Sequence, residues 1–151
     1  MKVIVWVDSW QMECCGEPFT TGSRVTWTVA EPDTDWLASI LGHDEAAAVT
    51  HAEEHHGNEL TSVEGVVQGI RAVHYKSAPK DYGDPRHLYP VEGSTTIRQV
   101  VSADGRNQVD DMDFGGYLVD LGEAREQTGQ GPFDHGAGGR ARRRGKPSFP
   151  Q

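Results

Sequence analysis

The sequence predicts a mainly β domain: a small, strongly bent antiparallel β-barrel of SH3-like or OB-like type, with one short helix and a disordered C-terminal tail. Several segments rich in β-branched and aromatic residues are separated by glycine and proline turns. Two glycines inside the longest of these segments indicate the sharp bends of a small barrel. One segment has clear helical spacing of its apolar residues.

The first third of the chain predicts two strands, over residues 2–7 and 24–29. Residues 2–7 combine β-branched residues with Trp6 and are followed by Asp8. In residues 24–29 apolar and polar side chains alternate, which is the pattern of a half-buried strand. Its apolar face consists of Val25, Trp27 and Val29.

Residues 34–41 predict the short helix. Trp36 and Ile40 are four residues apart, as neighbours on one helix face are, and Gly42 ends the segment. Residues 44–56 leave two alternatives open. Their alanines favour a helix, whereas the pattern of their second half fits a strand with a polar face equally well.

Three further strands are predicted over residues 63–76, 95–102 and 116–121, all rich in β-branched or aromatic residues. Residues 77–94 contain three prolines and two glycines, so we expect a long irregular loop there. One apolar core is expected from the alternation in the strands and the helical spacing. Its predicted members are Trp6, Val25, Trp27, Trp36, Ile70, Val73 and Leu118.

The chain is predicted to form one domain over residues 1–122, followed by a disordered tail over 123–151 that is rich in glycine and arginine. Residues 1–139 carry 9 Lys/Arg and 23 Asp/Glu, a charge of −14, whereas residues 140–151 carry 5 Lys/Arg and no acid. An acidic body repels phosphate backbones, so duplex DNA is not an expected partner of the folded part. The basic tail is a candidate contact for nucleic acid or for acidic surfaces.

We expect a cytoplasmic location. The 151 residues include two cysteines, which are adjacent and form no disulfide framework, and no signal peptide precedes them. No apolar run approaches the roughly 20 residues of a membrane span.

The leading functional interpretation is a non-enzymatic binding module without a cofactor. The predicted loop carries cationic and aromatic residues, and Trp10 and Cys14 of the N-terminal block complete a candidate ligand surface. Such a surface suits a partner protein or a small anionic or extended ligand. The loop residues of this candidate site are His74, Tyr82, Arg86, His87 and Tyr89.

Two enzymatic alternatives stay open. His51, Glu54 and His55 match an H-x-x-E-H string, in which two helical histidines bind zinc and the glutamate acts as a general base of a hydrolase. Cys14 and Cys15 would serve a thiol-based redox protein if a neighbouring group lowered the pKa of one thiol.

The block from Trp6 to Phe19 contains Trp-Val-Asp-Ser-Trp-Gln-Met-Glu-Cys-Cys-Gly-Glu-Pro-Phe and is followed by Gly22-x-x-Val25-x-Trp27. It resembles a family of small uncharacterised actinobacterial proteins, known as a domain of unknown function. Further matching stretches lie at residues 53–57, 69–74, 88–91 and 116–121, so the resemblance covers residues 2–121 and excludes the tail. It implies the limits of the folded domain and no activity, cofactor or catalytic residue.

Overall fold

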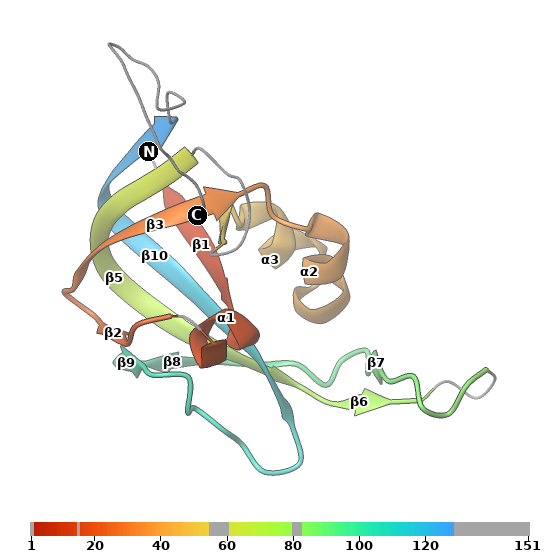
Figure 1. Cartoon of the computed structure of the whole chain (residues 1–151). Coiled ribbons are helices and arrows are strands. Elements are labelled where there is room, and N and C mark those ends of the chain that lie inside the picture. The colour runs from red at the N-terminus through yellow and green to blue at the C-terminus, as the bar shows by residue number, and fades with distance from the viewer. Residues whose placement is uncertain (1, 15, 55–60, 80–82, 129–151) are drawn as a thin grey trace.

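The computed structural model describes residues 2–14, 16–54, 61–79 and 83–128. It is mainly β, as predicted, and Figure 1 shows its strands wrapped around one another beside two short helices. The strands are β1 (Val3–Asp8), β2 (Phe19–Thr20), β3 (Arg24–Ala30), β4 (His51–Glu53), β5 (Thr61–Tyr75), β6 (Ser77–Ala78), β7 (Tyr89–Pro90), β8 (Thr96–Val100), β9 (Ser102–Ala103) and β10 (Asp113–Thr128). The helices are α1 (Ser9–Cys14), α2 (Thr34–Leu41) and α3 (His43–Ala48).

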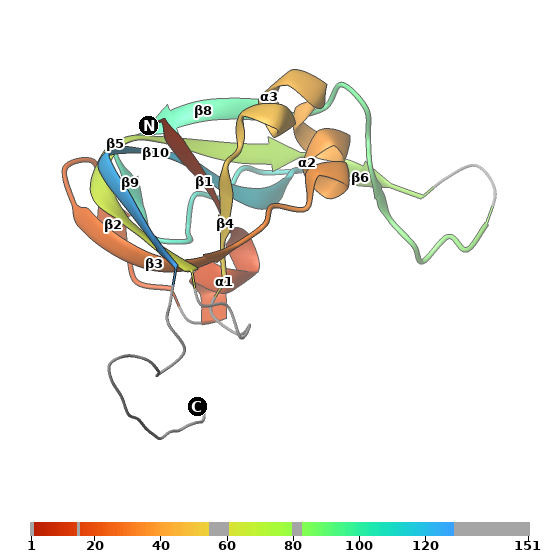
Figure 2. The same cartoon turned by 90° about the horizontal axis from the view of Figure 1, so that it is seen from above.

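The main sheet has the strand order β10-β1-β4-β3-β5-β8, and an additional pairing of β10 with β5 closes it in a ring. Figure 2 shows this ring of strands from above. The sheet is mixed and not antiparallel as predicted, because β1 and β4 run parallel and pair Val5 with His51 and Trp6 with Ala52. The connection from β1 to β4 is long and runs through α1, β2, β3, α2 and α3, and a long connection is what a parallel pair requires.

The ring closes because β5 is long and bent. It pairs with β10 from Thr61 to Tyr75, while its first half also pairs with β3 and its second half with β8. Three register shifts in the β5–β10 pairing bend the two strands. Gly65 lies at the bend, where a Cβ would come within 2.9 Å of the Gly122 carbonyl oxygen. Of the two glycines predicted to mark bends, Gly65 therefore lies where the strands approach closely, whereas a Cβ at Gly69 would make an ordinary contact with Asp120 Oδ2 at 3.5 Å.

Two apolar clusters form, one on each face of β1, instead of the single core that was predicted. Val3, Val5 and Val7 point into the ring, where they join Ile70, and Ile4 and Trp6 point to the outside. The outer cluster is covered by α2 and α3, with Leu37, Ile40, Val73 and Leu118 among its buried members. Of the predicted core residues, Val25, Trp27 and Trp36 are only half-buried.

The predicted helix over residues 34–41 is confirmed as α2. Asp33 caps it, because its Oδ1 accepts a hydrogen bond from the Trp36 N–H at 3.1 Å. Residues 44–56 contain both of the alternatives, since α3 ends at Ala48 and β4 begins at His51. The prediction of one helix is wrong, because α1 and α3 are present as well.

The five long strands predicted from the sequence are all present, with ends that differ by a few residues. The largest difference is at β10, which starts at Asp113 and runs to Thr128, beyond the predicted domain limit at residue 122. Residues 129–151 of the predicted tail lie outside the described part of the chain. Within the described residues, no helix has the length and apolar character needed to cross a membrane.

Candidate functional site

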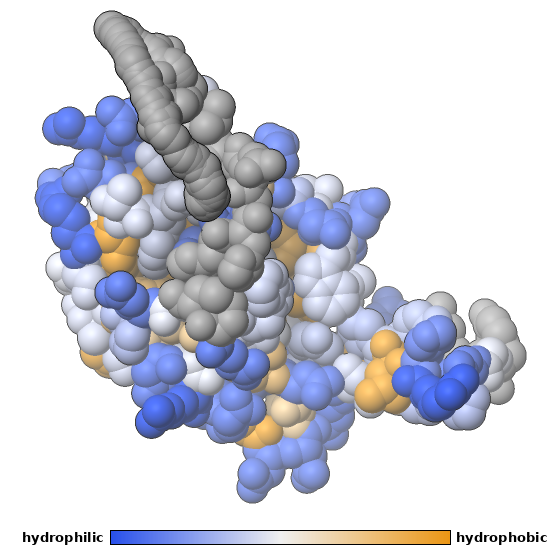
Figure 3. Space-filling model, in the orientation of Figure 1, coloured by the Kyte–Doolittle hydropathy of each residue, from blue (hydrophilic) through white to orange (hydrophobic). Residues whose placement is uncertain are grey.

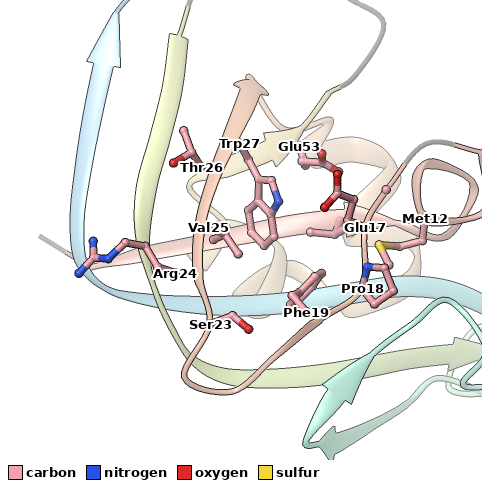
Figure 4. Close-up of a pocket in the computed structure, with 12 residues that line it drawn as sticks. Met12, Glu17, Pro18, Phe19, Ser23, Arg24, Val25, Thr26, Trp27 and Glu53 are labelled. Atoms are coloured by element: carbon pink, nitrogen blue, oxygen red, sulfur yellow. The ribbon is translucent and has the colours of Figure 1, made fainter.

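A pocket opens into the ring between β3, β4 and the segment from α1 to β2 (Figure 4). Its volume is about 500 Å³. Of the described residues that line it, all except Glu53 come from residues 7–27. The N-terminal block that distinguishes the sequence therefore builds most of this pocket.

The apolar wall of the pocket is aromatic. The rings of Phe19 and Trp27 meet edge to face, with centroids 5.1 Å apart, and Phe19 also contacts Tyr117 in the inner cluster. Val25 and Trp27 alternate with polar residues along β3, so both side chains point inward. Both are half-buried, and both line the pocket.

Gly16 and Gln11 position the segment that carries Phe19. The Gly16 N–H donates to the Gln11 carbonyl at 2.7 Å, which turns the chain at the end of α1. A Cβ at Gly16 would lie 2.9 Å from the Met12 sulfur and 3.1 Å from the Met12 Cα, so the turn brings residue 16 close against Met12. The buried Gln11 side chain donates to Glu54 Oε1 at 3.2 Å and thereby links α1 to the end of β4.

Glu53 is the buried carboxylate of the pocket. It pairs with Val29 across β3 and β4, and it is 6% exposed. Burial raises the pKa of the Glu53 carboxyl to about 7, and the negative charge of neighbouring Glu54 adds to the rise. Near neutral pH the pocket therefore holds a carboxyl group that can gain or lose a proton.

Arg24 supplies the positive charge at the rim, and its partners lie outside the pocket. Its guanidinium is 3.8 Å from a Glu64 carboxylate oxygen and 3.7 Å from one of Glu123. Figure 4 shows the Arg24 side chain directed away from Glu17 and Glu53. Glu17, which is exposed, and Glu53, which is buried, are the acidic residues among the described residues that line the pocket.

The predicted ligand site is divided between two regions. Trp10 and Cys14 lie on α1, where Trp10 is 48% exposed. Arg86, His87 and Tyr89 are exposed on an arm, residues 76–79 and 83–94, that extends away from the body in both Figures 1 and 2. The site stays a prediction, with its residues spread over α1 and the arm.

The other two residues of the predicted ligand site are His74 and Tyr82. His74 is 3% exposed, packs its ring 5.3 Å from that of Phe114, and hydrogen-bonds through Nε2 to the Asn107 carbonyl. Tyr82 lies outside the described residues. His74 thus forms part of the packing between β5 and the loop before β10.

The residues of the two enzymatic alternatives are only partly described. His51 lies in strand β4, so the helical spacing that would bring it beside His55 does not apply to it. Glu54 follows β4 and accepts the hydrogen bond from Gln11, and His55 lies outside the described residues. Cys14 is the last residue of α1, and Cys15 lies outside the described residues.

His51 belongs instead to a hydrogen-bonded chain that sequence reasoning missed. Its Nδ1 is 2.7 Å from Thr50 Oγ1, and its Nε2 is 2.6 Å from Glu126 Oε2. Thr50 also exchanges two hydrogen bonds of 3.0 Å with the backbone of Ile4. These hydrogen bonds connect β1, β4 and β10, so they stabilise the closed ring of strands.

The pocket residues Met12, Phe19 and Glu53 were not predicted as a site. The only signal for Glu53 in the sequence is its place in the acidic string before His55, where a strand would turn Glu53 and Glu54 to opposite faces. Its burial depends on the pairing of β4 with β3, which no local pattern reveals.

Fold and pocket together define a mainly β domain with a concave, ligand-sized site. The chain belongs to a family of unknown function, DUF6578, whose model matches residues 1–123. The resemblance found in the sequence is thereby confirmed at the level of the family. No curated protein and no solved structure matches the chain.

Proposed function

We propose that the protein is a non-enzymatic binding module, built on a small bent β-barrel of SH3-like or OB-like kind, that holds a small organic ligand in the pocket beside Trp27. The observation that carries this proposal is the cavity of about 500 Å³ with an aromatic wall and a buried carboxyl. Pockets of roughly 300–1,000 Å³ are typical of small-molecule sites.

The surroundings of the pocket support a pre-formed site. The edge-to-face contact of Phe19 with Trp27 fixes the aromatic wall, and the hydrogen bond from Gly16 to Gln11 fixes the segment opposite it. A wall held in this way loses little conformational entropy on binding, which favours affinity for a small molecule.

Nuclear magnetic resonance of the full chain tests the proposal. With ¹⁵N-labelled tryptophan, each of the four indole N–H groups gives one signal, and a Trp27→Phe variant assigns the signal of the pocket. We expect members of a small aromatic fragment library to shift the Trp27 signal and to leave that of Trp36, on the outer face, in place. Shifts that spare Trp27 throughout the library would contradict the proposal.

The arm is a second candidate contact, for an extended or anionic partner. Leu88 is 61% and Tyr89 40% exposed there, and Figure 3 shows hydrophobic side chains gathered on the arm. A titration with a single-stranded oligonucleotide that shifts backbone signals of residues 86–91 would support this contact, and unchanged signals for those residues would count against it.

We assign the module to the cytoplasm, on the basis of its two adjacent cysteines.

A further inference from the structure

We propose that the pocket selects organic cations, in particular primary amines attached to a flat apolar group, with Glu53 and Glu17 as the anionic partners and Trp27 and Phe19 as the aromatic wall. This inference rests on the proposed function, because it names the chemical class of the ligand of the same pocket.

The carboxylates favour a cation because they lie on the same side of the pocket. Glu53 comes from β4 and Glu17 from the segment before β2, and Figure 4 shows both carboxyl groups beyond the same edge of the Trp27 indole. An ammonium group offers three N–H donors and no acceptor, so it can satisfy two carboxylates at once. An anion at this position would meet like charge.

The aromatic wall favours the same class. Trp27 and Phe19 are half-buried and buried, respectively, and a cation within about 6 Å of such a ring is attracted by its negative face. Val25 and Met12 add apolar surface next to these rings. In a ligand with an ammonium head and a flat apolar body, the head would therefore contact the carboxylates and the body would contact the aromatic wall.

The charged groups around Glu53 are consistent with this selection. Glu54 follows it along the chain, Glu17 shares the pocket, and Arg24 is engaged by Glu64 and Glu123. His51, two residues before Glu53 on β4, is hydrogen-bonded to Glu126. A bound ammonium ion supplies the positive charge that favours the ionised form of Glu53, so amine binding should strengthen as pH rises from 6 to 8.

Three probes of nearly equal shape test the inference on the full chain: 2-phenylethylamine, 2-phenylethanol and 3-phenylpropionate. Each is titrated while the indole N–H signal of Trp27 is followed. We expect the amine to bind about tenfold more tightly than the alcohol, since a charge-assisted hydrogen bond is roughly twice as strong as a neutral one, and the carboxylate to bind most weakly.

Two variants locate the effect. Glu53→Gln should weaken amine binding about tenfold and leave alcohol binding unchanged, because it removes the charge and keeps the shape. Glu92→Gln, an exposed site on the arm with the same change in net charge, should alter neither. If Glu53→Gln does not fold, Glu17→Gln in the exposed segment before β2 serves instead, with an expected loss of several-fold.

The outcomes separate this inference from the proposed function. Preference for the amine that is lost in Glu53→Gln or Glu17→Gln supports both. Equal binding of alcohol and amine, or tighter binding of 3-phenylpropionate, overturns the cation selectivity and leaves the pocket as a ligand site. Absence of any Trp27 shift with all three probes overturns both.

Discussion

The two faces of the ring are built from the same strands and serve different ends. On the outer face, α2 and α3 cover Ile4, Trp6 and Leu118, and the cluster is closed. On the inner face, Val25 and Trp27 are left half-buried beside a cavity of about 500 Å³. The outer cluster therefore supplies stability, whereas the inner face leaves apolar surface uncovered beside the pocket.

The strongest test of this comparison is the Trp6→Ala substitution. Trp6 is 4% exposed and packs so closely on β10 that a Cβ at Gly116 would come within 2.9 Å of its ring. Removing the side chain should lower the free energy of unfolding by about 3–5 kcal/mol, the usual cost of a large cavity in a closed core. Urea unfolding followed by circular dichroism measures this loss, and a loss below about 1 kcal/mol would show that the outer cluster is not the stabilising one.

Glu53→Gln should change how stability depends on pH. Because the folded chain binds the Glu53 proton up to a pKa of about 7, against 4.5 for the ordinary group, the wild type loses stability as pH rises through this window. At about 1.4 kcal/mol per pH unit, the full loss amounts to about 3–4 kcal/mol. The variant has no such carboxyl and should give a flatter profile.

Unfolding midpoints at pH 5, 6, 7 and 8 measure this difference. Glu92→Gln is the matched control and should keep the slope of the wild type, because Glu92 is exposed. Parallel profiles for the wild type and Glu53→Gln would contradict the burial of this carboxyl.

Trp27→Ala should cost less than Trp6→Ala. We expect about 1–2 kcal/mol, because one side of the Trp27 ring faces the pocket and loses no protein contact. From the sequence alone the expected cost is about 3–5 kcal/mol, the value for a fully buried ring. The same urea series checks it, and a loss equal to that of Trp6→Ala would mean that the inner face is as closed as the outer one.

Trp10→Ala should have the smallest effect. Trp10 is 48% exposed on α1, and the hydrogen bond to Asp8 Oδ1 comes from its backbone N–H, which alanine retains. The expected change in unfolding free energy is within about 0.5 kcal/mol, as for other surface positions. A loss of more than about 1 kcal/mol would show that α1 packs through this indole.

Local patterns predicted the long strands and α2, because alternation and helical spacing act over neighbouring residues. They did not predict α1, whose six residues are too few to show a period. The parallel pairing of β1 with the three-residue β4 is a tertiary contact and leaves no sequence signal. The unbroken apolar run of β1 does indicate burial on both faces of the strand. Because both faces are buried, the structure has two apolar clusters where one core was predicted.

The candidate site was less predictable than the fold. The N-terminal block was singled out by its composition, and it does line the pocket. Its predicted partner was the loop that forms the arm, whereas in the structure the opposite wall is completed by Glu53 of β4. The pKa of Glu53 is raised mainly because the fold buries its carboxyl, and no spacing along the chain reveals that burial.

The most direct test of the account is the pKa of Glu53, measured by carboxyl ¹³C resonance in the full chain with and without saturating 2-phenylethylamine. The account predicts a pKa of about 7 for the free protein and a lower pKa with the amine bound, since a cation favours the ionised carboxylate. A free value close to the ordinary 4.5, or a value that the amine does not move, would contradict it.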